Sequence, residues 1–113
     1  MTEVNSEKET YPLVKVPGYS SFTLSSKKTT LYLKNPSENE VSFKYFLVDT
    51  DTNKVIYESN LIAPGKPYPL DVRKLLNVGI HHISINIDAY REINGEFVKR
   101  NSYNFPITVT VED

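Results

Sequence analysis

The sequence of 113 residues contains no cysteine, no tryptophan and only four glycines. The lack of cysteine excludes disulfide bonds, thiolate zinc sites and cysteine nucleophiles. The glycines are not clustered, so the chain has no glycine-rich loop that could cradle a phosphate group. No strictly apolar run exceeds three residues, far fewer than the roughly 20 that a membrane-spanning helix needs.

An excess of charge of either sign is also missing. Thirteen basic and fourteen acidic residues leave a net charge of −1, and no run of like charge exceeds two residues. Binding to nucleic acid in general requires a basic face that displaces counterions from phosphates, and binding to anionic lipid requires a basic cluster. We therefore expect no nucleic-acid partner, and membrane attachment only through a segment outside this sequence.

Residues that favour β-strands are abundant. Eight tyrosines and five phenylalanines accompany many valines, isoleucines and threonines, as is typical of strands. Residues 1–11 are polar and without period, which predicts a flexible tail or linker. Residues 12–113 have the length of a single folded domain.

Alternation of apolar and polar residues predicts the individual strands. They are expected over Tyr19–Leu24, Thr29–Lys34, Val41–Asp49, Lys54–Glu58, an edge segment containing Pro67 and Pro69, Ile80–Glu92 and Phe97–Glu112. About seven strands at regular intervals, with turn residues between them, predict an all-β, immunoglobulin-like Greek-key β-sandwich.

The connections carry their own predictions. Asn94–Gly95 is expected to form a type I′ hairpin turn. Pro106 predicts an edge position or a bulge, because proline cannot donate to a ladder. Leu61–Gly65 is expected to be a crossing loop, and Leu70–Asn77 a helix of one or two turns.

Asp49, Asp51 and Asn53 copy the first three ligand positions of an EF-hand calcium loop. The match then fails, because Lys54 replaces the required glycine and Asn60 replaces the bidentate glutamate. We favour a polar hairpin turn and leave weak calcium binding open. No cofactor and no metal site are predicted.

The side chains that catalysis would require are not arranged for it. His81 and His82 are adjacent, so on a strand they point to opposite faces and cannot ligate one metal together. No serine lies in a G-x-S-x-G elbow, and no carboxylates are paired as in a glycosidase. We therefore expect no catalytic residues and no enzymatic activity.

Aromatic residues on outward or edge positions offer binding potential, because tyrosine supplies rigid amphipathic contact area. The candidates are Tyr32, Phe46, Tyr57, Tyr68 and Tyr90. The alternative is that these rings cover the sheet faces and stiffen cross-strand pairs. The second interpretation is favoured.

Several short motifs together resemble a group of small β-sandwich domains from Gram-positive bacteria. They are V-P-G-Y-S at Val16–Ser20, L-x-L-x-N-P-x-x-N at Leu31–Asn39, F-K-Y at Phe43–Tyr45, V-I-Y-E-S-N-L-I-x-P-G-K at Val55–Lys66, L-x-x-G at Leu76–Gly79 and a terminal V-T-V. Domains of this group usually follow an export signal or a membrane anchor. The resemblance therefore implies an extracellular or cell-surface location, with the signal or anchor outside this sequence.

Most of these motifs have an evident structural role in turns, whereas Tyr57–Ser59 has none. The candidate binding surface consists of Tyr57, Glu58, Ser59, Asn60, Pro64 and Gly65. We expect a non-catalytic interaction or structural module whose partner is a protein or a component of the cell envelope. One alternative is a carbohydrate-binding module. The other is a small β-sandwich proteinase inhibitor, which the N-P-x-x-N and P-G pattern more loosely resembles, with the Asn60–Pro69 loop presented to its target.

Overall fold

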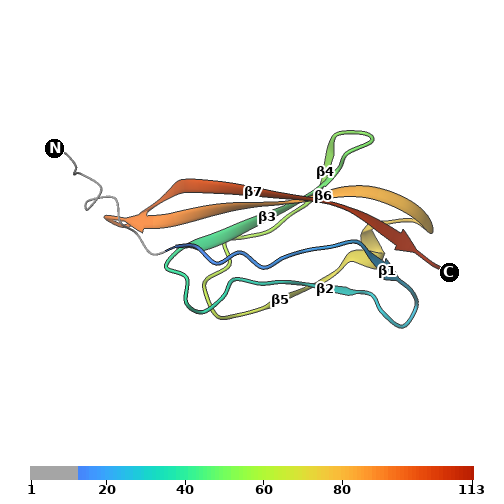
Figure 1. Ribbon diagram of the computed structural model, residues 1–113, viewed down its shortest axis with the longest axis horizontal. Helices are drawn as coiled ribbons and strands as arrows, with labels where there is room; N and C mark the ends of the chain where they lie inside the picture. The colour runs from blue at the N-terminus through green and yellow to red at the C-terminus, as the bar shows by residue number, and fades with distance from the viewer. Residues whose placement is uncertain (1–12) are drawn as a thin grey trace.

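Two β-sheets make up the fold in the computed structural model, which describes residues 13–113 (Figure 1). The strands are β1 (Phe22–Leu24), β2 (Thr30–Leu33), β3 (Ser42–Asp49), β4 (Lys54–Glu58), β5 (Tyr68–Asp71), β6 (Gly79–Ile93) and β7 (Glu96–Val111). One sheet has the order β1-β7-β6-β3-β4, and the other consists of β2 and β5. In Figure 1 the large sheet is seen nearly edge-on, and β2 and β5 form a second layer below it. The all-β prediction is confirmed, and the predicted tail over residues 1–11 lies outside the described residues.

The core lies between the sheets and follows the predicted alternation. On β3 the side chains of Phe43, Tyr45 and Leu47 are buried, and their neighbours along the strand are not. The remaining buried apolar residues are Leu24, Leu33, Val41, Ile62, Leu70, Val72, Ile83, Ile85, Ile87, Ala89, Ile107, Val109 and Val111. Each fully buried side chain of this size contributes about 1.5–3 kcal/mol through removal of apolar area from water.

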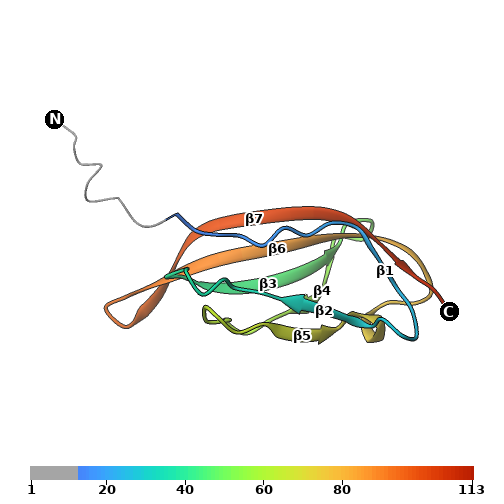
Figure 2. The ribbon, with the colours of Figure 1, turned by 60° about the horizontal axis from the view of Figure 1, so that its bottom comes forward.

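β6 and β7 form a long hairpin, whose turn lies beyond the start of β3 in Figure 2. Asn94 and Gly95 have φ angles of 55° and 84°, the two positive values that a type I′ turn requires. Pro106 lies where β7 is an edge, because β1 pairs with β7 only over Val109–Val111. The edge prediction is therefore correct, while the register shift of the hairpin falls elsewhere, between Ala89 and Tyr90.

The first strand differs most from its prediction. Only Phe22–Leu24 of the expected Tyr19–Leu24 is a strand, and it runs parallel to β7. Residues before it are held by side chains instead: the Thr108 N–H donates to Ser21 Oγ at 2.9 Å. Alternation alone does not distinguish main-chain pairing from such side-chain contacts.

The predicted helix of one or two turns over Leu70–Asn77 is a single turn that covers only the middle of this range. Leu70 and Asp71 belong to β5, and a 3₁₀-helix, η2, covers only Val72–Leu75. The main-chain N–H groups of Val72 and Arg73 donate to the carbonyl of Thr29, at 3.0 and 3.4 Å. This anchors η2 to the start of β2. No described helix is long and apolar enough to cross a membrane.

Two buried asparagine side chains organise the turn between β2 and β3. Asn35 Nδ2 donates to the carbonyls of Val41 (2.9 Å) and Ile62 (2.8 Å), and Asn39 Nδ2 donates to Asn35 Oδ1 (2.8 Å). Asn39 also exchanges two hydrogen bonds with the main chain of Lys15, at 2.7 and 2.8 Å. The pair thus joins three separate segments, a larger role than the turn that the N-P-x-x-N motif implies.

Two tyrosine hydroxyls occupy the end of β2. The Tyr45 hydroxyl donates to the Lys34 carbonyl at 2.5 Å and lies 2.9 Å from the Tyr19 hydroxyl. The Lys34 N–H donates to both hydroxyls, at 3.1 and 3.2 Å. Burial raises the pKa of both phenols above their usual value. The rings meet edge to face, with centroids 6.0 Å apart.

Candidate binding site

A hollow of about 290 Å³ lies between the end of β4 and the start of β5, and we call it the Tyr57–Tyr68 hollow. Its lining residues are Tyr57, Glu58, Ser59, Asn60, Leu61, Ile62 and Tyr68. Tyr57 lies opposite Leu47 in the ladder and therefore points to the inner side of the large sheet. The hollow thus opens at the border between the two sheets, and four of the six predicted binding residues line it.

The surroundings of the hollow alter the ionisation of the Tyr57 phenol. Burial, and secondly the hydrogen bond to Tyr68, raise the pKa of Tyr57 from its usual 10.0 to about 12. The Tyr68 side chain is 47% exposed. The hollow therefore presents two phenol groups, one sheltered and one accessible.

Glu58 and Ser59 have defined structural roles beside the hollow. Glu58 Oε2 lies 2.8 Å from Lys44 Nζ, and this hydrogen bond raises the pKa of Lys44. The buried Ser59 hydroxyl accepts from the Tyr45 N–H (2.8 Å) and donates to the Asn60 carbonyl (2.7 Å). Ser59 therefore holds the wall of the hollow, and a ligand would meet Asn60 and the tyrosines instead.

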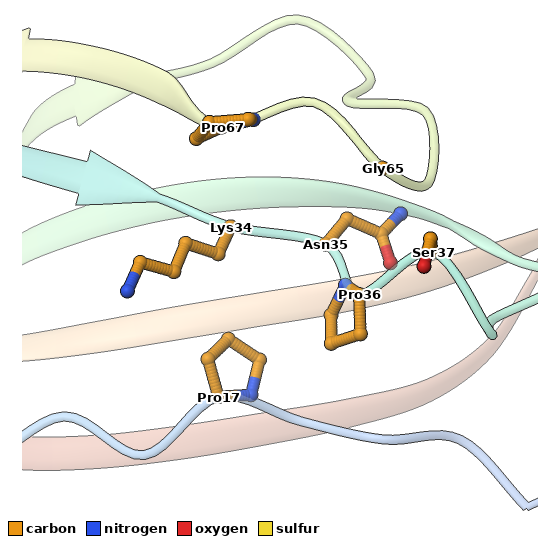
Figure 3. A pocket seen from close by; sticks show the side chains of 7 residues that line it. All are labelled: Pro17, Lys34, Asn35, Pro36, Ser37, Gly65 and Pro67. Carbon is orange, nitrogen blue, oxygen red and sulfur yellow. The ribbon is translucent and has the colours of Figure 1, made fainter.

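The other two predicted residues lie elsewhere. Gly65 lines a second hollow of about 280 Å³, the proline hollow, together with Pro17, Pro36 and Pro67 (Figure 3). The Gly65 N–H donates to the Asn35 carbonyl at 2.7 Å, and Gly65 has a φ of 96°. Pro64 is part-buried and lines neither hollow. The structure therefore divides the predicted surface into two places.

The five candidate aromatic rings do not gather on one face. Tyr32 and Tyr68 are about half exposed, whereas Phe46, Tyr57 and Tyr90 are part-buried. Phe46 lies opposite Glu58, on the face of the large sheet away from Tyr57, and Lys44 Nζ lies 5.8 Å from its ring centroid. Of the five rings, only Tyr57 and Tyr68 meet in a hollow.

Asp49, Asp51 and Asn53 form the turn between β3 and β4. Asp49 Oδ1 accepts hydrogen bonds from the N–H groups of Asp51 (2.9 Å) and Thr52 (3.2 Å), and Asn53 has a φ of 61°. This is the local Asx geometry of a polar turn, the interpretation favoured from the sequence. Within residues 13–113, no three potential metal-ligating side chains of histidine, cysteine, aspartate or glutamate come together.

The two histidines point to opposite sides of β6 as predicted. His82 is exposed, and its Nδ1 lies 3.1 Å from Asp51 Oδ2. His81 is part-buried, and its Nε2 lies 2.7 Å from the Asn77 carbonyl. The sequence does not reveal the His82–Asp51 pair, because its members are 31 positions apart and meet only through the β3–β6 ladder.

The raised pKa of Tyr57 predicts a loss of stability in alkali. A phenol that ionises at 10.0 when unfolded and at about 12 when folded keeps its proton longer in the native state. Its contribution is therefore complete below pH 10 and decreases as the pH rises from about 10 to about 12. Denaturant unfolding followed across this range is expected to show a smaller decrease for Tyr57→Phe than for the unchanged protein. An equal decrease in both would contradict the assignment.

No family model, curated protein or solved structure matches this chain.

Proposed function

We propose that the protein is a non-catalytic binding module with immunoglobulin-like topology. The strand order supports this assignment, since β7, β6 and β3 correspond to G, F and C of such a domain, and β2 and β5 to B and E. β4 then corresponds to the additional strand C′, and β1 to a first strand that has moved to the edge of the G strand. Domains of this architecture present binding surfaces at sheet edges and loops.

The Tyr57–Tyr68 hollow is the observation that carries the proposal. It combines two phenols, the Asn60 amide and the Leu61 side chain, which is 39% exposed. Binding sites typically join apolar and aromatic walls with a few polar groups that fix orientation. The same walls accept a peptide side chain or a sugar ring, so the partner is a protein or a cell-envelope glycan.

A location on the cell surface belongs to the same proposal. Its support is the resemblance of the Leu31–Asn39 and Val55–Lys66 motifs to exported domains of Gram-positive bacteria. A protein or glycan of the envelope is the kind of partner that such a location offers.

Two arrays test the binding function, one of bacterial envelope oligosaccharides and one of overlapping surface-protein peptides. We expect binding on one of them, reduced at least tenfold by Tyr68→Ala and by Asn60→Ala. The matched control is Phe97→Ala on β7, because Phe97 is 49% exposed and Tyr68 is 47% exposed. The absence of binding on both arrays, or an equal loss of binding for Tyr68→Ala and Phe97→Ala, would overturn the proposal.

The loop after β4 supports a second candidate, a proteinase inhibitor. Ile62 exchanges main-chain hydrogen bonds with Phe43 (2.7 and 3.0 Å), and the Gly65 N–H is bound to Asn35. A loop that is fixed at two points loses little entropy when a partner binds it. Inhibition assays against serine, cysteine and metallo-proteinases separate the candidates. Lys66 is an exposed residue of this loop. Inhibition that Lys66→Ala abolishes favours the second candidate, and no inhibition in any class removes it.

A further inference from the structure

One edge of β2 lacks a neighbouring strand within residues 13–113. β2 pairs with β5 on one side, and on its other side lie residues 18–22. The link across this gap is a side chain, because the Tyr19 hydroxyl lies 3.0 Å from the carbonyl of Tyr32. Paired strands lie about 4.8 Å apart, whereas a tyrosine side chain reaches farther from its own main chain. The segment is thus held at a distance from β2.

The main-chain groups at this edge can be assigned from the register. Alternate residues of an antiparallel strand direct both main-chain groups to the same side. The Thr29 carbonyl accepts from η2, on the β5 side, and the carbonyls of Tyr32 and Lys34 meet the tyrosine hydroxyls on the other side. Thr30 and Tyr32 therefore face the open edge, and the Tyr32 partner on β5 is Pro69, which has no N–H to donate.

A hollow of about 290 Å³, the β2-edge groove, lies along this edge. Its walls are β2 and residues 18–22, and Phe22 and Leu31, both packed against the core, contribute apolar surface to it. Tyr32, which is 51% exposed, also lines the groove. The four residues of β2 span roughly 13 Å at the usual strand rise, a length that suits a short extended peptide.

The charged residues that line the groove have one sign. They are Lys28 and Lys34, and no acidic residue is among the lining. Charge of one sign along a binding surface selects a partner of the other sign. An extended peptide that reaches these lysines is favoured when it carries carboxylates.

We propose that the β2-edge groove binds an extended, acidic segment of a protein partner, which adds to β2 as a further strand. Strand addition gains affinity from main-chain hydrogen bonds, and pockets for alternate side chains give specificity. Here the main-chain groups are the N–H and carbonyl of Thr30 and the N–H of Tyr32, since the Tyr32 carbonyl already accepts from the Tyr19 hydroxyl, and the lysines select the charge. This site is separate from the Tyr57–Tyr68 hollow and does not depend on it.

The test titrates the ¹⁵N-labelled full chain with the capped peptide Glu-Val-Glu-Val-Glu-Val. We expect amide shifts centred on Thr30 and Tyr32, and hydrogen exchange at both amides slowed at least tenfold. The same peptide with alternate N-methyl groups keeps its charge but cannot pair as a strand, and it is expected to bind at least tenfold more weakly. Equal binding of the two peptides would show that the groove attracts acidic peptides through charge alone. That result would overturn the proposal.

Charge reversal provides the matched variants. Lys28→Glu combined with Lys34→Glu is expected to lose at least tenfold in affinity and to gain binding of Lys-Val-Lys-Val-Lys-Val. Lys27→Glu is the control, because Lys27 is an exposed neighbour that does not line the groove. Equal losses in the variant and the control, or shifts confined to β4 or the Tyr57–Tyr68 hollow, would contradict strand addition at β2.

Discussion

Replacing Asn35 by alanine is expected to destabilise the domain by about 3–4 kcal/mol, since each buried polar group left without a partner costs about 1–3 kcal/mol. Asn35 is 3% exposed, and its amide donates to the carbonyls of Val41 and Ile62. The Ile62 carbonyl also accepts from the Phe43 N–H, so the groups left without this partner are the Val41 carbonyl and the Asn39 amide. Its Oδ1 also accepts from Asn39. Urea unfolding, followed by tyrosine fluorescence, measures the change.

Asn60→Ala is the control for this prediction, because Asn60 is an exposed asparagine, and exposed substitutions usually change stability by no more than about 0.5 kcal/mol. Asn35→Asp separates shape from hydrogen bonding. It keeps the size of the side chain but removes both donors, so we expect a loss at least as large as for alanine. A loss below about 1 kcal/mol for Asn35→Ala would show that the hydrogen bonds of the asparagine pair contribute little to the free energy of unfolding.

The second large effect is expected at Tyr45. Its ring is completely buried and packs edge to face with Phe43 and Tyr19. Tyr45→Ala removes the ring, and large aromatic-to-alanine changes in cores cost about 3–5 kcal/mol. Tyr45→Phe removes only the hydroxyl that binds the main chain of Lys34, and we expect about 1–2 kcal/mol. The same unfolding experiment separates the two contributions.

Tyr32→Phe is the control for the hydroxyl, since the Tyr32 side chain is 51% exposed. It is expected to leave the free energy of unfolding unchanged within about 0.5 kcal/mol. The hydroxyl cluster also predicts where Tyr45→Phe acts. Amide exchange at Lys34 is expected to accelerate, while exchange in the β6–β7 hairpin remains as before. Acceleration spread evenly over the sheets would show a global rather than a local effect.

Local sequence patterns predict most of the fold, because each depends on near neighbours in the chain. Alternation along β3 and β6 identifies the core positions Phe43, Tyr45 and Ile85. The Asn94–Gly95 turn follows from the need for two positive φ angles. The bounds of β4 agree with the prediction at both ends.

Features that depend on distant partners could not be predicted in this way. The parallel pairing of β1 with β7 joins residues 87 positions apart at Phe22 and Val109. The role of Asn35 as a link to Ile62, 27 positions away, is equally hidden in a motif that indicates only a turn. A single sequence contains no pattern that relates such positions.

Of the candidate site, the sequence predicts some of the residues that lie together and not their surroundings. Tyr57–Ser59 has no turn role in the sequence, and these residues line a hollow together with Asn60 and Tyr68. The sequence could not show that Ser59 is buried and that its hydroxyl accepts a hydrogen bond from the Tyr45 main chain. Nor could it show that Gly65 faces a different hollow, because loop residues close in sequence diverge in space. The β2-edge groove has no sequence signal, since it results from the separation of β2 and residues 18–22.

We propose that the Tyr57–Tyr68 hollow serves binding rather than the stability of the fold. The most direct measurement takes Tyr68→Ala and determines both its free energy of unfolding and its affinity for the strongest ligand of the two arrays. We expect a change in stability of about 1 kcal/mol or less, as is usual for an exposed side chain, and an affinity at least tenfold lower. An unchanged affinity, or a large loss of stability that accounts for the weaker binding, would contradict it.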